Sequence, residues 1–186
     1  MTEMYYLLTF LLTITSLRIV LADFTIYIGK TNDITDVGVT YSSTQLQVHD
    51  HAPLSCSDMG HVVSISASTN NDASKGRWAC DGCSAKAVRD WDISRYEIYN
   101  RKDAIGHSTD HPFPVFNIAT GAVTLYRTEN GHYDMRDIHN GFLGTCSRPA
   151  HPQELDCWQL ISATFLTHVF TCTSDLVPNK GLWIPE

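Results

Sequence analysis

Six cysteines, which all follow an apolar N-terminal segment, set the strongest limit on how this chain can fold. They are Cys56, Cys80, Cys83, Cys146, Cys157 and Cys172. An even number of cysteines in an exported chain argues for structural disulfides rather than catalytic thiols. We therefore expect three disulfide bonds that stabilise one small extracellular domain.

The pairing of the cysteines is less constrained than their number, because six cysteines allow many arrangements. Cys146 and Cys157 bracket a short loop that contains proline. Cys80 and Cys83 form a Cys-x-Gly-Cys turn in which Gly82 tolerates a tight backbone. The remaining two would join early and late parts of the chain. The expected pairs are Cys146 with Cys157, Cys80 with Cys83, and Cys56 with Cys172.

The N-terminal segment, residues 1–22, has the pattern of a secretory signal peptide. The stretch Tyr5–Leu17 carries no charge, and it is shorter than the roughly 20 residues that span a bilayer. Arg18 ends it, and Val20 and Ala22 then supply small residues at the −3 and −1 positions, which favours cleavage before Asp23 over retention as a membrane anchor. We expect one secreted domain over residues 23–186, without membrane attachment after cleavage.

The formal charge of −7 at neutral pH disfavours a nucleic-acid partner, because binding to phosphates requires a basic face. The chain also contains nine histidines, whose protonation would add nine positive charges. In an acidic extracellular fluid the protein would therefore be close to neutral. The expected partner is a protein, and the expected state is a monomer.

Short apolar segments separated by turns predict a mainly β fold. Strict alternation over Asp23–Gly29 is typical of a strand, and similar short strands are expected at 37–41, 45–49, 61–66, 77–80, 115–118, 122–127, 132–138 and 142–146. Asn-Gly pairs at 130–131 and 140–141 are typical of hairpin turns. A further strand is expected within 91–100, with a bulge or burial on both faces.

The segment Trp158–Phe170 fits either a helix face or a strand, and we favour a final strand with a helical turn before it. Trp78, Trp91 and Trp158 lie near cysteines or in strand-like runs, so we expect them in the core. Together these elements predict a single antiparallel β-sandwich or barrel with at most a short helix.

Histidine pairs raise the question of a metal site. His49 and His51 would share a strand face, His107 and His111 have a helical spacing, and His132 and His139 form a third pair. A catalytic zinc needs a third ligand and a helical frame, which the sequence lacks around these pairs. Cys80-x-x-Cys83 lacks the context of a redox or zinc motif and is better explained by a disulfide. We expect no metal and no cofactor.

Acid-base hydrolysis is the main enzymatic alternative. Small secreted ribonucleases combine histidine, glutamate and arginine around a phosphodiester. Here Arg127, Glu129 and His132 lie close together in the sequence. The same residues also fit a polar turn without catalytic function, because Glu129 directly precedes an Asn-Gly pair.

The chain combines four features: an export signal, the start Asp23–Tyr27 of the mature part, the turn Cys80-Asp81-Gly82-Cys83, and the late pair Thr171-Cys172. This combination resembles the small secreted cysteine-containing proteins of filamentous fungi that are treated as effector candidates. The resemblance implies delivery to a host surface or apoplast and action by binding. Inhibition of a host papain-like cysteine protease is one mode that it implies, and it transfers no functional residue.

Polar loops on a disulfide-stabilised β scaffold form a rigid display for binding. We expect four such loops, at 30–36, 67–76, 107–114 and 147–154. A rigid loop loses little entropy when it enters a protease cleft. The sequence therefore favours a non-enzymatic interaction protein, with a small hydrolase or ribonuclease as the alternative.

Overall fold

A computed structural model describes residues 22–34, 40–61, 64–66, 78–83, 87–100, 116, 121–158 and 162–178. The predicted signal peptide lies outside these residues, except for Ala22. The expected loops at 67–76 and 107–114 and nearly all of the strand at 115–118 also lie outside them. Of that strand only Phe116 is described, and it forms a single bridge with Pro178.

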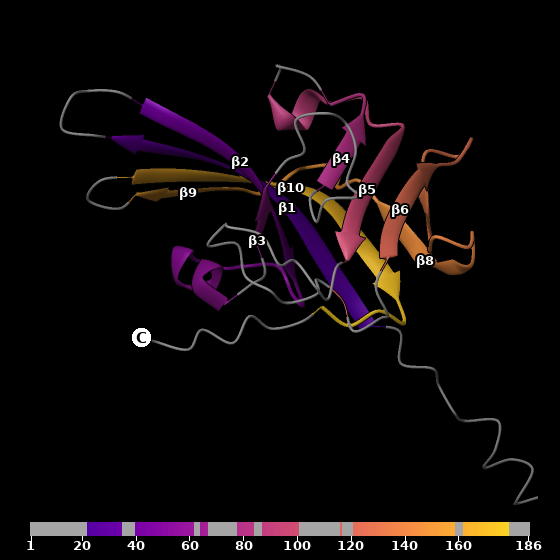
Figure 1. Ribbon diagram of the computed structural model, residues 1–186. Coiled ribbons are helices and arrows are strands. Elements are labelled where there is room, and N and C mark those ends of the chain that lie inside the picture. Colours follow the sequence, from indigo (N-terminus) through magenta and orange to yellow (C-terminus); the bar gives the residue numbers. More distant parts are fainter. Residues whose placement is uncertain are drawn as a thin grey trace, which may run out of the picture.

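In the described part of the chain, ten antiparallel strands form one continuous, strongly curled sheet (Figure 1). The strands are β1 (Ala22–Ile34), β2 (Thr40–His49), β3 (Ser64–Ser66), β4 (Trp78–Asp81), β5 (Arg95–Asn100), β6 (Gly121–Arg127), β7 (Tyr133–Arg136), β8 (Phe142–Ser147), β9 (Glu154–Trp158) and β10 (Ser162–Ser174). Two short 3₁₀ helices lie within the described residues, η1 (Cys56–His61) and η3 (Val88–Asp90).

The strand order is β3-β2-β1-β10-β8-β7-β6-β5-β4, which makes the sheet a nearly closed barrel. The long strand β10 pairs with β1 on one edge, and on its other edge with β9 and then β8. The expected mainly β, antiparallel and disulfide-stabilised fold is therefore confirmed.

The core lies inside the curled sheet and joins strands that are distant in the strand order. Phe170 of β10 contacts Tyr96 of β5, with ring centroids 5.5 Å apart, and Tyr133 of β7 at 4.8 Å. Trp78 and Trp91 are buried in the same cluster, as expected. Trp158 is not, because it ends β9 beyond the edge of the core and is 71% exposed.

A bulge in β10 determines which residues of that strand reach the core. Ile26 pairs with Phe170 and Tyr27 pairs with His168, so Val169 is an extra residue in the ladder. Val169 and Phe170 are consecutive and both fully buried in the core. The bulge thereby reverses the alternation of β10 and places His168 on the outer face of the sheet, beside Tyr27.

Two sequence-based expectations are wrong in the region of β1 and β2. The expected loop at 30–36 is strand as far as Ile34, and residues 40–49 form one strand. Polar residues such as Thr31 belong to β1 because their backbones pair with β2 on one side and β10 on the other. Tertiary pairing here overrides the polar composition.

The strands and turns after residue 90 agree better with the expectations from the sequence. Each Asn-Gly pair lies in a hairpin connection, but only one residue of each pair has a positive φ, Gly131 at 78° and Asn140 at 65°, where it closes a turn that begins at Thr128 or Asp137. The expected strand at 142–146 is β8, and the final strand is longer than expected, since β10 begins at Ser162. In the segment 91–100 the strand begins only at Arg95, so the change of apolar parity after Ile93 marks the start of β5 rather than a bulge.

The three disulfides are Cys56–Cys157, Cys80–Cys83 and Cys146–Cys172. The expected Cys80–Cys83 pair is confirmed, whereas the expected Cys146–Cys157 and Cys56–Cys172 pairs are wrong. Cys146 and Cys172 are direct partners in the β8–β10 ladder and point into the core. Cys157 has its bond on the opposite face of the sheet, where η1 brings Cys56 within reach.

Gly82 in the Cys80–Cys83 turn gives a first testable prediction. Its φ is +90°, and an added Cβ would lie 1.9 Å from the backbone oxygen of Asp92. Gly82→Ala should therefore lower the free energy of unfolding by about 2–3 kcal/mol, measured by urea denaturation. Gly131→Ala is the matched control, because its φ is also positive but its Cβ would meet open space. Equal losses in the two variants would contradict the steric explanation.

Candidate functional site

A buried aromatic and polar cluster lies on the outer face of β1, β2 and β10. Tyr27 stacks on His168 with ring centroids 4.8 Å apart, and it meets the edge of His49 at 5.3 Å. Burial raises the pKa of Tyr27 to about 12 and lowers the pKa of His49 to about 4. The pKa of His168 is also lowered by burial, against the opposing effect of its contact with the Phe170 carbonyl. Both histidines are therefore neutral at pH 7.

Gln153 connects this cluster to the surface. Its side-chain oxygen accepts a hydrogen bond from the Tyr27 hydroxyl at 2.8 Å, and its side-chain nitrogen donates to the Pro53 carbonyl at 2.9 Å. Its backbone carbonyl accepts a hydrogen bond from the N–H of His168, also at 2.9 Å. One glutamine thus joins two surface segments to the sheet beneath them.

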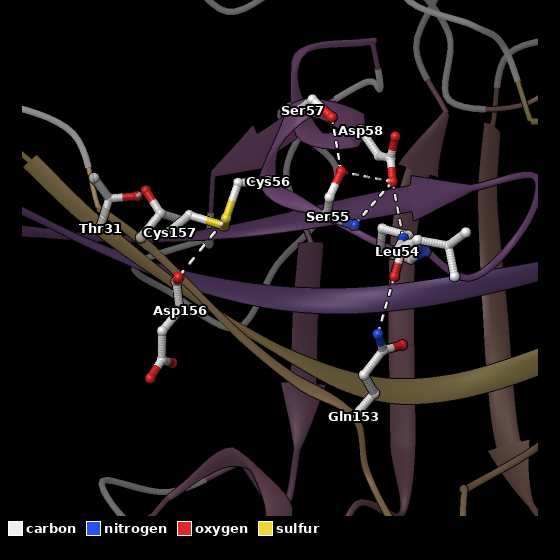
Figure 2. The surroundings of a disulfide bond; sticks show 11 residues. Thr31, Leu54, Ser55, Cys56, Ser57, Asp58, Gln153, Asp156 and Cys157 are labelled. Carbon is white, nitrogen blue, oxygen red and sulfur yellow. Dashed lines mark hydrogen bonds between the residues drawn. A yellow bond between two sulfur atoms is a disulfide. The ribbon is translucent and has the colours of Figure 1, made fainter.

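The first of these segments, residues 53–58, is called the anchored turn (Figure 2). Asp58 accepts hydrogen bonds from the backbone N–H groups of Leu54 and Ser55 at 2.8 and 3.0 Å, and these bonds lower its pKa. The Pro53 carbonyl is held by Gln153, and Cys56 is bonded to Cys157 of β9. The backbone of the turn is therefore held on both sides of its tip, at Pro53 and at Cys56, and at the tip itself by Asp58.

The side chain at the tip of the anchored turn is apolar. Leu54 is 86% exposed, although its backbone is fixed by Asp58. Among the described residues it is the most exposed large hydrophobic side chain. A rigid backbone that presents an exposed leucine has little entropy to lose on binding, and it gains free energy when the leucine is buried by a partner.

The second segment, residues 148–153, is called the proline loop. The Arg148 guanidinium donates hydrogen bonds to the backbone oxygens of Trp91, Val88 and Arg89, and Gln153 holds the other end. Between them Ala150 and His151 are exposed. Pro149 and Pro152 flank this tip, and each proline restricts the backbone further. The proline loop lies beside the anchored turn because Gln153 bridges the two.

The proline loop corresponds to the display loop expected at 147–154, with β8 ending at Ser147 and β9 starting at Glu154. The anchored turn was not among the expected display loops. Its sequence signal was a turn-rich stretch that contains Pro53 and Asp58, an aspartate that can accept backbone hydrogen bonds locally. Contacts between residues about 100 positions apart determine that Leu54 projects outward and that Gln153 links the anchored turn to the proline loop.

The residues of the hydrolase alternative lie in a different place, at the turn between β6 and β7. Arg127 forms an ion pair with Asp92, and Glu129 and His132 are exposed. The turn itself is closed by Thr128, whose backbone N–H donates to the His132 carbonyl at 2.8 Å. The three residues are thus close in space, but they occupy an exposed hairpin turn.

The histidine pairs do not share a site in the part of the chain that is described. His49 is buried against Tyr27, whereas His51 lies beyond the end of β2, where it is exposed and bonded to Asp50. His132 and His139 lie in the turns at opposite ends of β7. His107 and His111 lie outside the described residues. Within those residues no group of three potential metal ligands comes together.

Comparison with protein-family models, with curated proteins and with solved structures finds no match for this chain. In the described segments, no helix has the length and apolar character to cross a membrane. The three disulfides are compatible with an extracellular protein.

Proposed function

We propose that this chain is a secreted, effector-like interaction protein that binds an extracellular protein of a host. The observation that carries the proposal is the anchored turn, where an 86% exposed leucine projects from a backbone held by a disulfide, an aspartate and Gln153. Protein interfaces reward preorganised segments with an apolar anchor, because less entropy is lost when they bind.

Inhibition of a papain-like cysteine protease is the specific action that we propose. A protease cleft accepts an extended or turned segment with a projecting side chain, and the anchored turn presents Leu54 in this way. The proline loop alongside would widen the contact through Ala150 and His151. If the turn were cut after Leu54, its two ends would stay in place, because Gln153 holds Pro53 and the disulfide holds Cys56.

The surroundings of Arg127 favour binding over hydrolysis as the function. Its guanidinium is paired with Asp92, and Glu129 and His132 project from a hairpin turn that is open to solvent. General acid–base catalysis requires groups that are positioned within hydrogen-bond reach of a bound substrate. The anchored turn and the proline loop offer the better-organised surface.

An activity-based assay tests the proposed inhibition. Plant extracellular fluid is incubated with increasing amounts of the purified protein and then with a covalent active-site probe for papain-like proteases. Labelling of these proteases should fall as the protein concentration rises, while labelling of serine hydrolases by a second probe stays constant. Unchanged protease labelling at saturating protein would rule out this form of the function.

A further inference from the structure

The structure also presents an exposed tryptophan, packed against a partly buried phenylalanine, on the face of the sheet opposite the anchored turn. Trp158 of β9 is 71% exposed and meets the ring of Phe165 of β10 edge-on, with centroids 5.8 Å apart and an interplanar angle of 85°. Its neighbour Cys157 bonds to Cys56 on the other face, so the alternation of β9 directs Trp158 away from the anchored turn. This part of the sheet extends away from β4, β5 and β6 (Figure 1).

The cross-strand neighbours of the aromatic pair on the same face of the sheet are polar residues. Phe165 lies between Asp156 of β9 and Lys30 of β1, and Asn32 of β1 lies opposite Ala163, the partner of Trp158. An acid, a base and an amide thus share one face with two rings. The charges of Asp156 and Lys30 oppose each other, so the face has no strong preference for a charged ligand.

This combination suits a neutral saccharide. A sugar ring has an apolar C–H face, which stacks on an indole, and hydroxyl groups at its rim, which both donate and accept hydrogen bonds. Asp156 supplies an acceptor, Lys30 a donor and Asn32 both. Neighbouring strands are about 4.8 Å apart, so these groups are spaced to reach different hydroxyls of one or two sugar units.

A protein partner fits this face less well. Central anchors in protein interfaces are surrounded by other apolar side chains that exclude water. The other large hydrophobic side chains that are exposed in the described residues lie outside β9 and β10, at Leu54, Tyr126, Ile138, Phe142 and Val177. Trp158 and the partly buried Phe165 therefore stand among polar neighbours rather than in a larger apolar patch.

We propose that Trp158, Phe165, Asp156, Lys30 and Asn32 form a binding face for a neutral oligosaccharide. Trp158 is the stacking platform, and Phe165 fixes its orientation from the side. The site is independent of the proposed protease inhibition, because it lies on the opposite face of the sheet from Leu54. A protein with both sites would bind a polysaccharide surface while presenting the anchored turn to a second partner.

Isothermal titration of the purified protein with cellohexaose, chitohexaose and laminarihexaose tests this proposal. At least one of these probes should bind, and Trp158→Ala should weaken that binding about tenfold or more, as expected for the loss of one stacked aromatic ring. Asp156→Ala should weaken it to a smaller degree. Phe142→Ala, which removes another exposed ring, and Leu54→Ala should both leave it unchanged.

Two results would overturn the proposal. One is the absence of binding of all three hexasaccharides at millimolar concentration. The other is binding that Trp158→Ala and Asp156→Ala both leave unchanged. Sedimentation of the same variants identifies the competing occupant, because a dimer that Trp158→Ala dissociates would assign this face to a second copy of the chain. Circular dichroism of each variant establishes that the exposed substitutions leave the fold intact.

Discussion

Replacing Cys56 and Cys157 together by alanine should lower the free energy of unfolding by about 5 kcal/mol. The disulfide joins residues 101 positions apart, and in the chain-entropy model the stabilisation grows with the length of the loop that is closed. Chemical denaturation under non-reducing conditions measures the loss. The double replacement of Cys80 and Cys83 is the matched control, because that bond closes only three positions and should contribute about 2 kcal/mol.

The same variant should also release the anchored turn locally. Without the bond to Cys157, the turn keeps the contacts from Asp58 and Gln153 but loses its attachment to β9. Hydrogen exchange at the amides of Leu54 and Ser55 should then become faster than in the Cys80/Cys83 variant, whereas exchange in β6 and β7 should rise only as far as the loss of global stability requires. Equal losses of stability in the two double variants, or unchanged exchange at Leu54, would contradict this description of the disulfide.

Acidification from pH 7 to pH 4 should lower the stability by about 2–3 kcal/mol through His49. Burial lowers the pKa of His49 from 6.5 to about 4; proximity to His51 also lowers it, and Asp50 and Asp58 oppose the shift. Between these two pKa values the unfolded chain binds a proton that the folded protein does not, so stability is fully present above about pH 6.5, decreases as pH falls from 6.5 to 4, and levels off below pH 4. The lowered pKa of His168 adds to this effect in the same direction.

Urea denaturation at several pH values measures this dependence. His49→Gln should flatten the curve between pH 4 and pH 6.5, because glutamine does not titrate. His151→Gln, which changes an exposed histidine at the tip of the proline loop, should leave the slope as in the unchanged protein. A steep slope that persists in the His49→Gln variant would assign the acid sensitivity to other groups.

The regular parts of the fold could be predicted from local sequence, and the site could not. Alternation at Phe24, Ile26 and Ile28 identified β1, and the Asn-Gly pairs identified two hairpin turns, because both signals arise from neighbouring residues. The disulfide pairing depends on which cysteines share a face of the sheet. That arrangement is set by long-range register, so the two long-range pairs were assigned wrongly.

The buried cluster depends on a still less visible feature, the bulge at Val169. Without this extra residue, His168 would lie on the core side of β10 rather than against Tyr27. Nothing in the local pattern distinguishes Val169 from an ordinary strand residue. The exposure of Trp158 is likewise not predictable from local sequence. It follows from the position of β9 beyond the edge of the core and not from the neighbours of Trp158 in the sequence.

We propose that Leu54 on the anchored turn is the contact residue of a protease-binding surface. Its most direct test is the inhibition constant of the purified protein for a papain-like cysteine protease, compared between Leu54→Ala and Val177→Ala. Val177 is also exposed, but it lies after β10 and outside the anchored turn. Leu54→Ala should raise the inhibition constant about ten- to a hundredfold, because one buried leucine side chain is lost from the complex, and Val177→Ala should leave it unchanged. Equal constants for the two variants, or no inhibition by the unchanged protein, would contradict the claim.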